Sequence, residues 1–278
     1  MRSDTSATAE LGSIWRYPVK SMMGEEVESS YITERGLLGD RYYALVDQST
    51  GKVISAKNPR RWPNLFACSA IFLEPPDIHA EGLPPVRITL HDRTTVTSLE
   101  DEVDSVLSRA MGAKVSLQSK PPASFNIEEY WPDVENLSHR ETVTDEVMAR
   151  GTFFDGEVVH LLTTASLERL RREYPQGDFE ACRFRPNLVV TPASGAEGFV
   201  ENSWIGSMMT IGREVRLYIM RPTSRCVMTT LPQGNLPKDI GILKTAVRAN
   251  GANVGVYATV ARGGTIRKGD EVRIEAPA

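Results

Sequence analysis

The sequence has few cysteines, few histidines and no long apolar run. Its three cysteines, Cys68, Cys182 and Cys226, lie far apart among 278 residues. An odd number of cysteines without a CxxC pair argues against a disulfide framework, a zinc site or an iron–sulfur cluster, and single thiols fit a reducing compartment. No apolar run approaches the roughly 18 residues of a membrane span, and the N-terminus lacks the apolar region of a secretory signal. We therefore expect a cytoplasmic protein without a membrane span, in which residues 1–9 form a flexible lead.

Neither sign of charge is in large excess. The chain has 32 Lys and Arg against 36 Asp and Glu, for a net charge of −4, and this balance gives no indication of binding to nucleic acid or to a membrane surface. A hydrophobic content of 41% and a length near two domains of about 150 residues indicate a globular chain with a sizeable core. The polar segment 128–139 is expected to be a linker or a surface excursion.

Short strand-like runs dominate the sequence and recur about ten residues apart in its second half, a spacing typical of a barrel or a sandwich. The segment 48–51 between Val46 and Val53 has the composition of a hairpin connection that ends in Gly51. We expect strands at residues 11–17, 26–32, 42–47, 65–73, 86–90, 158–162, 188–191, 209–211, 215–220, 254–260 and 271–274.

Three helices are expected between these strands. The first follows a capping box formed by Ser98 and Asp101 and ends at Gly112. The others cover residues 167–173 and 240–248, and the last of them begins after Asp239. The strands are too many for a helical bundle and the helices too few for a doubly wound sheet, so a β-rich α+β protein of two halves is predicted.

Cys226 is the first candidate for chemistry. It follows a strand-like run, which places it at a strand end or in a loop. Arg221 and Arg225 are close in sequence, and nearby cations stabilise a thiolate, while Ser224 offers a hydroxyl beside it. A buried thiol that acts as a small hydrophobe is the alternative interpretation. Cys68 is expected in the core, and Cys182 is ambiguous with the core favoured.

Arg185 and Asn187 flank Pro186 just before a strand. Proline fixes the backbone, arginine suits bidentate binding of a phosphate, and asparagine offers both a donor and an acceptor. A surface turn with salt bridges explains the same residues, and the two interpretations stay open.

Thr163, Thr164 and Ser166 open a helix after a buried strand. Free N–H groups at such a position favour an anion, but ordinary N-capping is the simpler explanation. We therefore favour capping on the residues alone.

The remaining candidates are weaker. Lys20, Ser21 and Arg41 place cations and a hydroxyl at turn-like points. Asp155 is most simply a turn former, since it precedes a glycine. His160, inside an apolar run, is expected to be a satisfied core histidine.

Several motifs follow one another in a fixed order over residues 10–275. They are Tyr17-Pro-Val-Lys-Ser21, Gly36-Leu-Leu-Gly-Asp-Arg-Tyr42, Phe154-Asp155, Leu161-Leu-Thr-Thr-Ala-Ser-Leu167, Arg183-Phe-Arg-Pro-Asn187, Ser224-Arg-Cys226 and Gly264-Thr-Ile-Arg-Lys-Gly-Asp270. As a set they resemble the MOSC-domain family, and within it the branch of the mitochondrial amidoxime-reducing component and related bacterial reductases. The resemblance implies a MOSC-type β-barrel domain at residues 126–278, preceded by a MOSC-associated β-barrel domain at residues 10–125.

The resemblance also implies a molybdenum cofactor, molybdopterin, and roles for individual residues. Cys226 would be a catalytic residue whose thiolate ligates the metal, and Asp155 a catalytic acid near it. The implied cofactor-binding residues are Lys20, Ser21, Arg41, Arg185, Asn187 and Ser224 by position in the motifs, and Arg225, Thr164 and Ser166 by neighbourhood.

The expected activity is reduction of a small N-oxygenated substrate, such as an N-hydroxylated base. Bacterial relatives often carry a ferredoxin domain after this region, whereas this chain ends at Ala278 without further cysteines. We therefore expect a separate ferredoxin- or cytochrome-type protein to supply electrons, and Asp155 or water to relay protons.

Two other functions stay open from the sequence. The protein could carry the cofactor, or carry sulfur as a persulfide on Cys226 formed without pyridoxal phosphate. Alternatively, an anion-binding module for a nucleotide or a protein partner could be built from Arg60, Arg61, Arg183 and Arg185.

Overall fold

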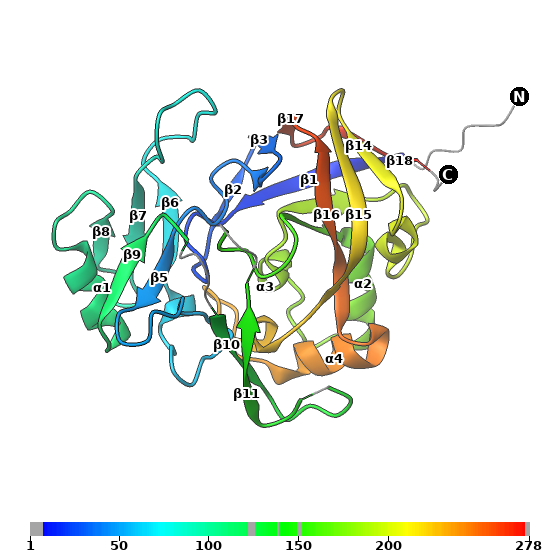
Figure 1. The fold of residues 1–278 in the computed structure, drawn as a ribbon. Coiled ribbons are helices and arrows are strands. Elements are labelled where there is room, and N and C mark those ends of the chain that lie inside the picture. The colour runs from blue at the N-terminus through cyan, green and yellow to red at the C-terminus, as the bar shows by residue number, and fades with distance from the viewer. Residues whose placement is uncertain (1–7, 122–125, 138, 149–151, 276–278) are drawn as a thin grey trace, which may run out of the picture.

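The computed structural model of the protein describes residues 8–121, 126–137, 139–148 and 152–275. A large barrel and a smaller β-rich part lie side by side, and a two-stranded hairpin extends between them (Figure 1). Residues 1–7 of the expected lead lie outside the described residues. Thr8 and Ala9 already belong to the first strand, so the expected lead was two residues too long.

Seven strands close into a barrel, and β1 completes the ring by pairing antiparallel with both β18 and β13. Strands β12 and β13 are a parallel pair, with Leu161 opposite Leu188. Because β1 and β18 come from opposite ends of the chain, closing the barrel requires both halves. The order around the barrel is β13 (Leu188–Thr191), β12 (Val159–Thr163), β16 (Asn253–Arg262), β15 (Val215–Ser224), β14 (Met208–Ile211), β18 (Glu271–Glu275) and β1 (Thr8–Arg16).

Alternation of side chains along these strands fills the barrel with apolar residues. Val215, Leu217 and Ile219 alternate with exposed residues along β15, and all three are buried in one cluster inside the barrel. This period-two pattern is the signal on which strand prediction relies. Each Å² of apolar surface removed from water contributes about 25 cal/mol of stabilising free energy, which favours the closed barrel.

Three helices cover one end of the barrel (Figure 1). They are α2 (Thr164–Glu173), α3 (Ala181–Phe184) and α4 (Ile240–Asn250), and their apolar sides form a second cluster with Val254 of β16. Asp239 caps α4 by accepting a hydrogen bond from the Gly241 N–H at 2.7 Å, as expected from the sequence.

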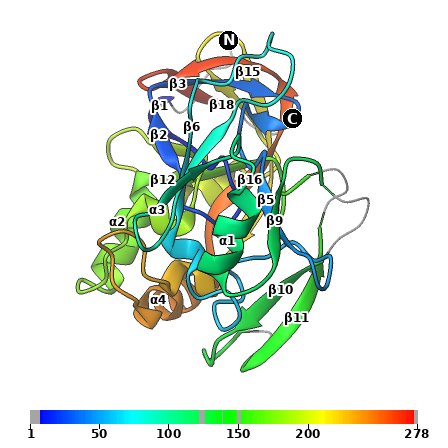
Figure 2. The same ribbon diagram turned by 90° about the vertical axis from the view of Figure 1, so that its left-hand side faces the viewer.

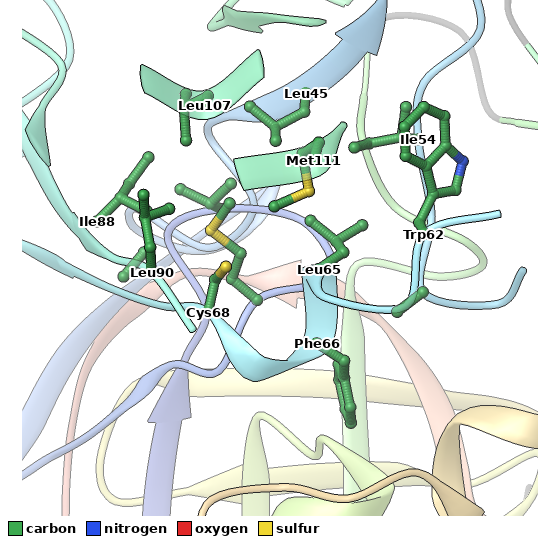
Figure 3. Packing of buried hydrophobic residues seen from close by; sticks show 14 of the residues in the cluster. Leu45, Ile54, Trp62, Leu65, Phe66, Cys68, Ile88, Leu90, Leu107 and Met111 are labelled. Carbon is green, nitrogen blue, oxygen red and sulfur yellow. The ribbon is translucent and has the colours of Figure 1, made fainter. Parts of the chain in front are cut away.

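The N-terminal part, which faces the viewer in Figure 2, has its own core around short strands and α1 (Val103–Met111). Figure 3 shows Leu107 and Met111 of α1 packing over Leu65 and Cys68. The second half also contributes to this core through Val227 and Met228. The strands are β5 (Ala44–Asp47) with β9 (Val115–Gln118), and β6 (Ser69–Phe72) with β7 (Val86–Thr89) and β8 (Thr95–Thr97).

Small strands join the two parts. Strand β2 (Glu25–Val27) extends the barrel sheet from β1, while β3 (Ser29–Thr33) pairs with β4 (Gly36–Leu37) and with β17 (Gly264–Arg267). Strands β3 and β17 thus form a sheet from residues more than 230 positions apart in the sequence.

The segment 128–139 is not a linker, which was one of the two possibilities that the sequence suggested. Residues 128–131 belong to a strand of a β-hairpin. Strand β10 (Asn126–Trp131) pairs antiparallel with β11 (Thr142–Val147). Glu129 is buried and Trp131 half-buried, so this polar strand has an inner face. Polar composition concealed the strand, since its burial depends on charged partners from elsewhere in the chain.

Most expected elements are confirmed within one to four residues, and three details are wrong. The expected strand at residues 26–32 is two strands, β2 and β3, which belong to different sheets. Residues Leu65–Ala67 form a 3-10 helix rather than the start of a strand. Ser98 does not cap α1, because its hydroxyl accepts a hydrogen bond from the Val86 N–H at 3.0 Å and Glu102 is the N-cap residue. The expected β-rich α+β class is confirmed. Within the described ranges, no helix is both long enough and apolar enough to span a bilayer.

Candidate functional site

A pocket of about 250 Å³ opens where the barrel, the hairpin and the N-terminal part meet. All predicted site residues line it except Thr164 and Ser166. Those brought together are Lys20, Ser21, Arg41, Asp155, Arg185, Asn187, Ser224, Arg225 and Cys226. Residues more than 200 positions apart in the sequence, such as Lys20 and Cys226, thus line the same pocket.

Cys226 lies between β15 and a 3-10 helix at Val227–Thr230. Val227 and Met228 anchor it by packing into the N-terminal core, and its own thiol is half-buried and free of any disulfide. The sequence suggested a thiolate stabilised by neighbouring arginines, and this was wrong. Burial and Glu129 together raise the pKa of the thiol to about 12, against the opposing effect of Lys57. A metal ion would still displace the proton, since coordination deprotonates a thiol.

Arg225 does not face the thiol, because its guanidinium is bound inside the protein. Nε donates to the Val254 carbonyl at 2.9 Å, Nη1 to the Phe184 carbonyl at 2.9 Å, and Nη2 contacts both Val254 and His160. Arg221 is likewise engaged, with Glu157 at 3.5 Å. Arg225 therefore fixes the chain next to Cys226 to β16 and α3.

Arg185 lines the pocket and retains one unused donor. Its Nη1 donates to the Met22 carbonyl at 2.6 Å and its guanidinium stacks 4.2 Å from the centroid of the Tyr17 ring. Arg185 is 9% exposed, and its Nη2 has no hydrogen-bond partner among the described residues. Burial and the nearby Arg41 lower its pKa to about 10, so it remains charged at neutral pH. An unpartnered buried guanidinium nitrogen is costly, and an anion in the pocket would remove that cost.

Arg41 and Asn187 are held by the buried carboxylate of Asp40. Asp40 accepts from Asn187 Nδ2 at 3.0 Å, from Arg41 Nη1 and from the Tyr17 N–H at 2.8 Å. Asn187 Oδ1 accepts from the His160 N–H at 3.0 Å, so this side chain is occupied within the protein. Asn187 therefore positions its neighbours instead of offering a free amide to a ligand.

Three pocket residues adopt the left-handed backbone conformation. The φ angles are +63° at Ser21, +52° at Arg41 and +51° at Arg185. This region is uncommon for residues other than glycine, and such strain concentrates at functional sites. Each strained residue is held in place: Ser21, for example, accepts a hydrogen bond from the Ala56 N–H at 3.1 Å through its hydroxyl.

A buried ion pair brings further charge to the pocket. Lys20 is buried, contacts Asp155 and donates to the Phe153 carbonyl at 2.8 Å. Burial lowers the pKa of Lys20 to about 8 although Asp155 opposes the shift. Burial of Asp155 is outweighed by Lys20, Lys57 and Arg41, which hold the pKa of its carboxyl well below the usual range. Asp155 thus stays ionised, and Lys20 holds the exchangeable proton of the pair.

Thr164 and Ser166 lie outside the pocket, at the start of α2. The Thr163 hydroxyl caps the helix by accepting from the Ser166 N–H at 3.2 Å. Both Thr163 and Ser166 donate through their hydroxyls to the buried Glu201 carboxylate at 2.6 Å. The capping interpretation is therefore confirmed, and the anion at this helix start is a side chain of the protein itself.

Sequence reasoning missed several residues of the pocket wall. Lys57 pairs with Glu129 at 3.0 Å, and Trp131 and Glu146 line the wall from the same hairpin face. Alternation along β10 was the available signal, since residues 127, 129 and 131 share a face. His160 is a satisfied buried histidine as expected, but it also lines the pocket.

In chemical terms the pocket joins a thiol to a cationic surface. Lys20, Arg41 and Arg185 can donate to an anion at one side, and Cys226 offers a soft sulfur ligand at the other. No group of three or more metal-ligating His, Cys, Asp or Glu side chains occurs in the described part of the chain. If the protein alone bound a metal in this pocket, the Cys226 thiol would be its one cysteine ligand. The pocket therefore suits a metal whose other ligands come from an anionic cofactor.

Comparisons with known proteins agree with this geometry. The family model of the MOSC domain matches residues 149–273, and that of the MOSC N-terminal beta barrel domain matches residues 8–113. The chain is 26% identical over 246 residues to a molybdenum cofactor sulfurase of Oryza sativa subsp. japonica, covering 80% of this chain and 28% of the relative. It is 27% identical over 231 residues to that of Solanum lycopersicum, covering 73% and 27%. The chain thus spans little more than a quarter of the length of these relatives.

Among solved structures, the YUAD protein of Bacillus subtilis superimposes with a TM-score of 0.51 over 98% of both chains at 10% identity. That likeness supports the fold alone. The two family models together cover both the barrel and the N-terminal part, in the order that the sequence motifs follow. The chain belongs to the MOSC-domain family.

Proposed function

We propose that the protein holds a molybdenum cofactor in this pocket and reduces small N-oxygenated compounds with electrons from a separate redox protein. The observation that carries the proposal is that one pocket is lined by both Cys226, a free thiol, and Arg185, whose buried Nη2 has no hydrogen-bond partner among the described residues. A soft ligand and an unsatisfied anion site are the two features that a metal on a phosphorylated pterin requires.

The cationic side of the pocket fits the phosphate of such a cofactor. Arg185 would hold it through Nη2, with Arg41 and Lys20 adding charge from neighbouring loops. Ser224, which is exposed at the end of β15, would donate a hydroxyl near the metal. Asn187 and Arg225 would act indirectly, because their side chains are already bonded within the protein.

When bound, the cofactor supplies the two-electron chemistry that breaks an N–O bond. The protein residues orient the cofactor and manage protons. Lys20 Nζ holds a proton beside Asp155, and its lowered pKa makes that proton available near neutral pH. Glu129, Trp131 and Glu146 on the hairpin would border the substrate.

Metal and pterin analysis tests the proposal directly. Protein from a cofactor-competent host should contain near-stoichiometric molybdenum and release a fluorescent pterin on oxidation, and Cys226→Ser should contain much less metal. Cys182→Ser is the matched control, since Cys182 is another half-buried free thiol but does not line the pocket. Turnover of an aromatic amidoxime with a reduced viologen dye then tests the activity without the natural electron donor. A folded parent without molybdenum, or full turnover by Cys226→Ser, would refute the proposal.

A second candidate function is carriage of the cofactor or of sulfur. Both curated relatives are named molybdenum cofactor sulfurases, and Cys226 is a free thiol in the pocket. A persulfide on Cys226 would add the mass of one sulfur atom to protein purified without reductant, and reductant would remove it. A mass equal to that of the unmodified chain argues against sulfur carriage.

A further inference from the structure

His160 contacts more of the predicted site residues than its sequence context indicates. It lies on β12 and is 5% exposed. Its backbone N–H donates to Asn187 Oδ1 at 3.0 Å, and its carbonyl accepts from the Asn187 N–H at 2.8 Å. Two hydrogen bonds therefore fix His160 to Asn187 before its ring is considered.

The imidazole of His160 bridges two arginines of the site. Nδ1 lies 3.2 Å from the carbonyl oxygen of Arg185, and Nε2 contacts Nη2 of Arg225. A carbonyl can only accept and a guanidinium can only donate, so the hydrogen must be on Nδ1 and the ring must be neutral. Burial and Arg225 hold the pKa of His160 well below its ordinary value, in agreement with this tautomer.

The surrounding backbone leaves space for this ring. Gly255 on the neighbouring strand β16 has φ of +84°, and a Cβ added there would lie 2.6 Å from His160 Nε2. The Tyr257 ring, with its centroid 5.7 Å from that of the imidazole, lies against the same ring. The contact between His160 and Arg225 thus depends on a glycine at a position where a side chain would collide with it.

We propose that His160 is a positioning residue that keeps the Arg225–Cys226 segment in register with the Arg185–Asn187 turn. One neutral ring connects the chain that carries the thiol to the chain that carries the unpartnered guanidinium. The inference rests on the proposed function only in treating the pocket as the site of an anionic ligand. Loss of the ring removes the link between the two segments, while Arg225 keeps its bonds to the Val254 and Phe184 carbonyls and Arg185 keeps its bond to the Met22 carbonyl.

The test compares His160→Leu with His160→Gln in the full chain purified without cofactor. Two properties are measured: binding of inorganic phosphate by calorimetry, and the rate of Cys226 alkylation by iodoacetamide, followed by mass spectrometry. His160→Leu should weaken phosphate binding about tenfold, the equivalent of one hydrogen-bonded contact, and accelerate alkylation about threefold or more. His160→Gln retains an acceptor and a donor and should restore both properties to within about twofold of the parent.

Val159→Ala is the matched control for general destabilisation. Val159 precedes His160 on β12, and its side chain is fully buried in the barrel cluster, away from the arginines. It should lower the unfolding temperature but leave phosphate binding and alkylation unchanged. Equal effects of Val159→Ala and His160→Leu, or parental behaviour of His160→Leu, would overturn the inference.

The outcome is separable from the proposed function. Neither readout needs molybdenum or turnover, so a protein without reductase activity still gives a result. If the parent binds no phosphate, the alkylation rates alone decide: acceleration in His160→Leu with rescue by His160→Gln supports positioning, and equal rates in all variants refute it.

Discussion

The guanidinium of Arg185, a residue that lines the pocket, stacks on the ring of Tyr17, 4.2 Å from its centroid. Arg41 approaches the same ring at 5.0 Å, so two like charges share one buried phenol. The Tyr17 hydroxyl is itself fixed, because it donates to the Pro186 carbonyl at 3.0 Å. Tyr17 therefore holds two cations close together, an arrangement that an anion between them would stabilise.

Replacing Arg185 with glutamine should weaken phosphate binding by about tenfold to a hundredfold, because a charge-assisted hydrogen bond from a buried guanidinium is lost. Calorimetric titration of the cofactor-free chain with inorganic phosphate measures this. Arg172→Gln is the control, since Arg172 is half-exposed on α2 and pairs with Glu197 at the surface. Equal affinities of Arg185→Gln and the parent would contradict an anion site at Nη2.

Phosphate binding should decline as the pH rises through about 8, where Lys20 loses its proton in the folded protein. The pKa of Lys20 is lower in the folded protein, about 8, than in the unfolded chain, 10.5. Between these two values the unfolded chain binds more protons, so raising the pH favours the folded state. Over the same interval the folded protein loses a cation from the pocket. Titrations between about pH 7 and 9.5 measure the decline, and phosphate itself stays largely dianionic over most of this range. Lys20→Met should abolish the step, and a parent profile without a step would contradict the assignment.

Strand positions could be predicted because they depend on local alternation. The run at residues 158–162 became β12, shifted by one residue, since its apolar side chains contact the barrel core wherever the partners originate. The polar hairpin could not be predicted in this way. Glu129 is buried because Lys57, from a loop 72 residues away, pairs with it.

For the residues of the pocket, too, the sequence could not predict contacts between distant positions. Motifs identified Cys226 and Arg185, but not what their neighbours do. Arg225 is adjacent to Cys226 in sequence, yet its guanidinium is bonded to β16 and α3, and burial of the thiol still raises the pKa of Cys226. Thr163 and Ser166 matched an anion-binding pattern, but Glu201, 35 residues further along, already occupies their hydroxyls. Contacts between distant positions decide these roles.

Glu201→Ala should destabilise the protein by roughly 2–4 kcal/mol, because the hydroxyls of Thr163 and Ser166 lose their acceptor in a buried site. Glu201→Gln should retain most of the stability, since an amide can bond to both hydroxyls. Urea unfolding of the two variants measures the difference. Equal stability of Glu201→Ala and the parent would contradict a structural role for this carboxylate.

The same carboxylate should make stability depend on pH. Burial raises the pKa of Glu201 above its ordinary 4.5, even though Ser166 and Thr163 oppose the shift. The folded state therefore binds the proton more tightly, and the contribution of Glu201 is fully present below pH 4.5 and is lost as the pH rises through the folded pKa. The stability of Glu201→Gln relative to the parent should increase over that interval. A constant difference between the two proteins across it would argue against this assignment.

Arg183 should be among the most important single residues for the segment after Cys226. It is 1% exposed, and its guanidinium donates to four carbonyls: Asp178 at 2.7 Å, Thr229 at 3.3 Å, Leu231 at 3.2 Å and Pro237 at 2.9 Å. Arg183→Met keeps much of the volume but removes every donor, so a loss of roughly 3 kcal/mol or more is expected in urea unfolding.

A change in Arg183 should also alter the reactivity of the Cys226 thiol, because Thr229 and Leu231 lie within five residues of Cys226 in the chain. Once the carbonyls of these two residues lose Arg183, the 3-10 helix that begins after Cys226 loses two of the bonds that hold it, while its packing into the N-terminal core and the hydrogen bond from the Asp239 N–H to the Thr230 carbonyl at 2.9 Å remain. Cys226 alkylation should therefore accelerate in Arg183→Met under conditions where the protein stays folded. Arg172→Met removes an exposed arginine of the same size and should change the free energy of unfolding by less than about 0.5 kcal/mol, with no effect on alkylation. If both variants behave alike, Arg183 is an ordinary charged residue and the thiol owes its position to apolar packing alone.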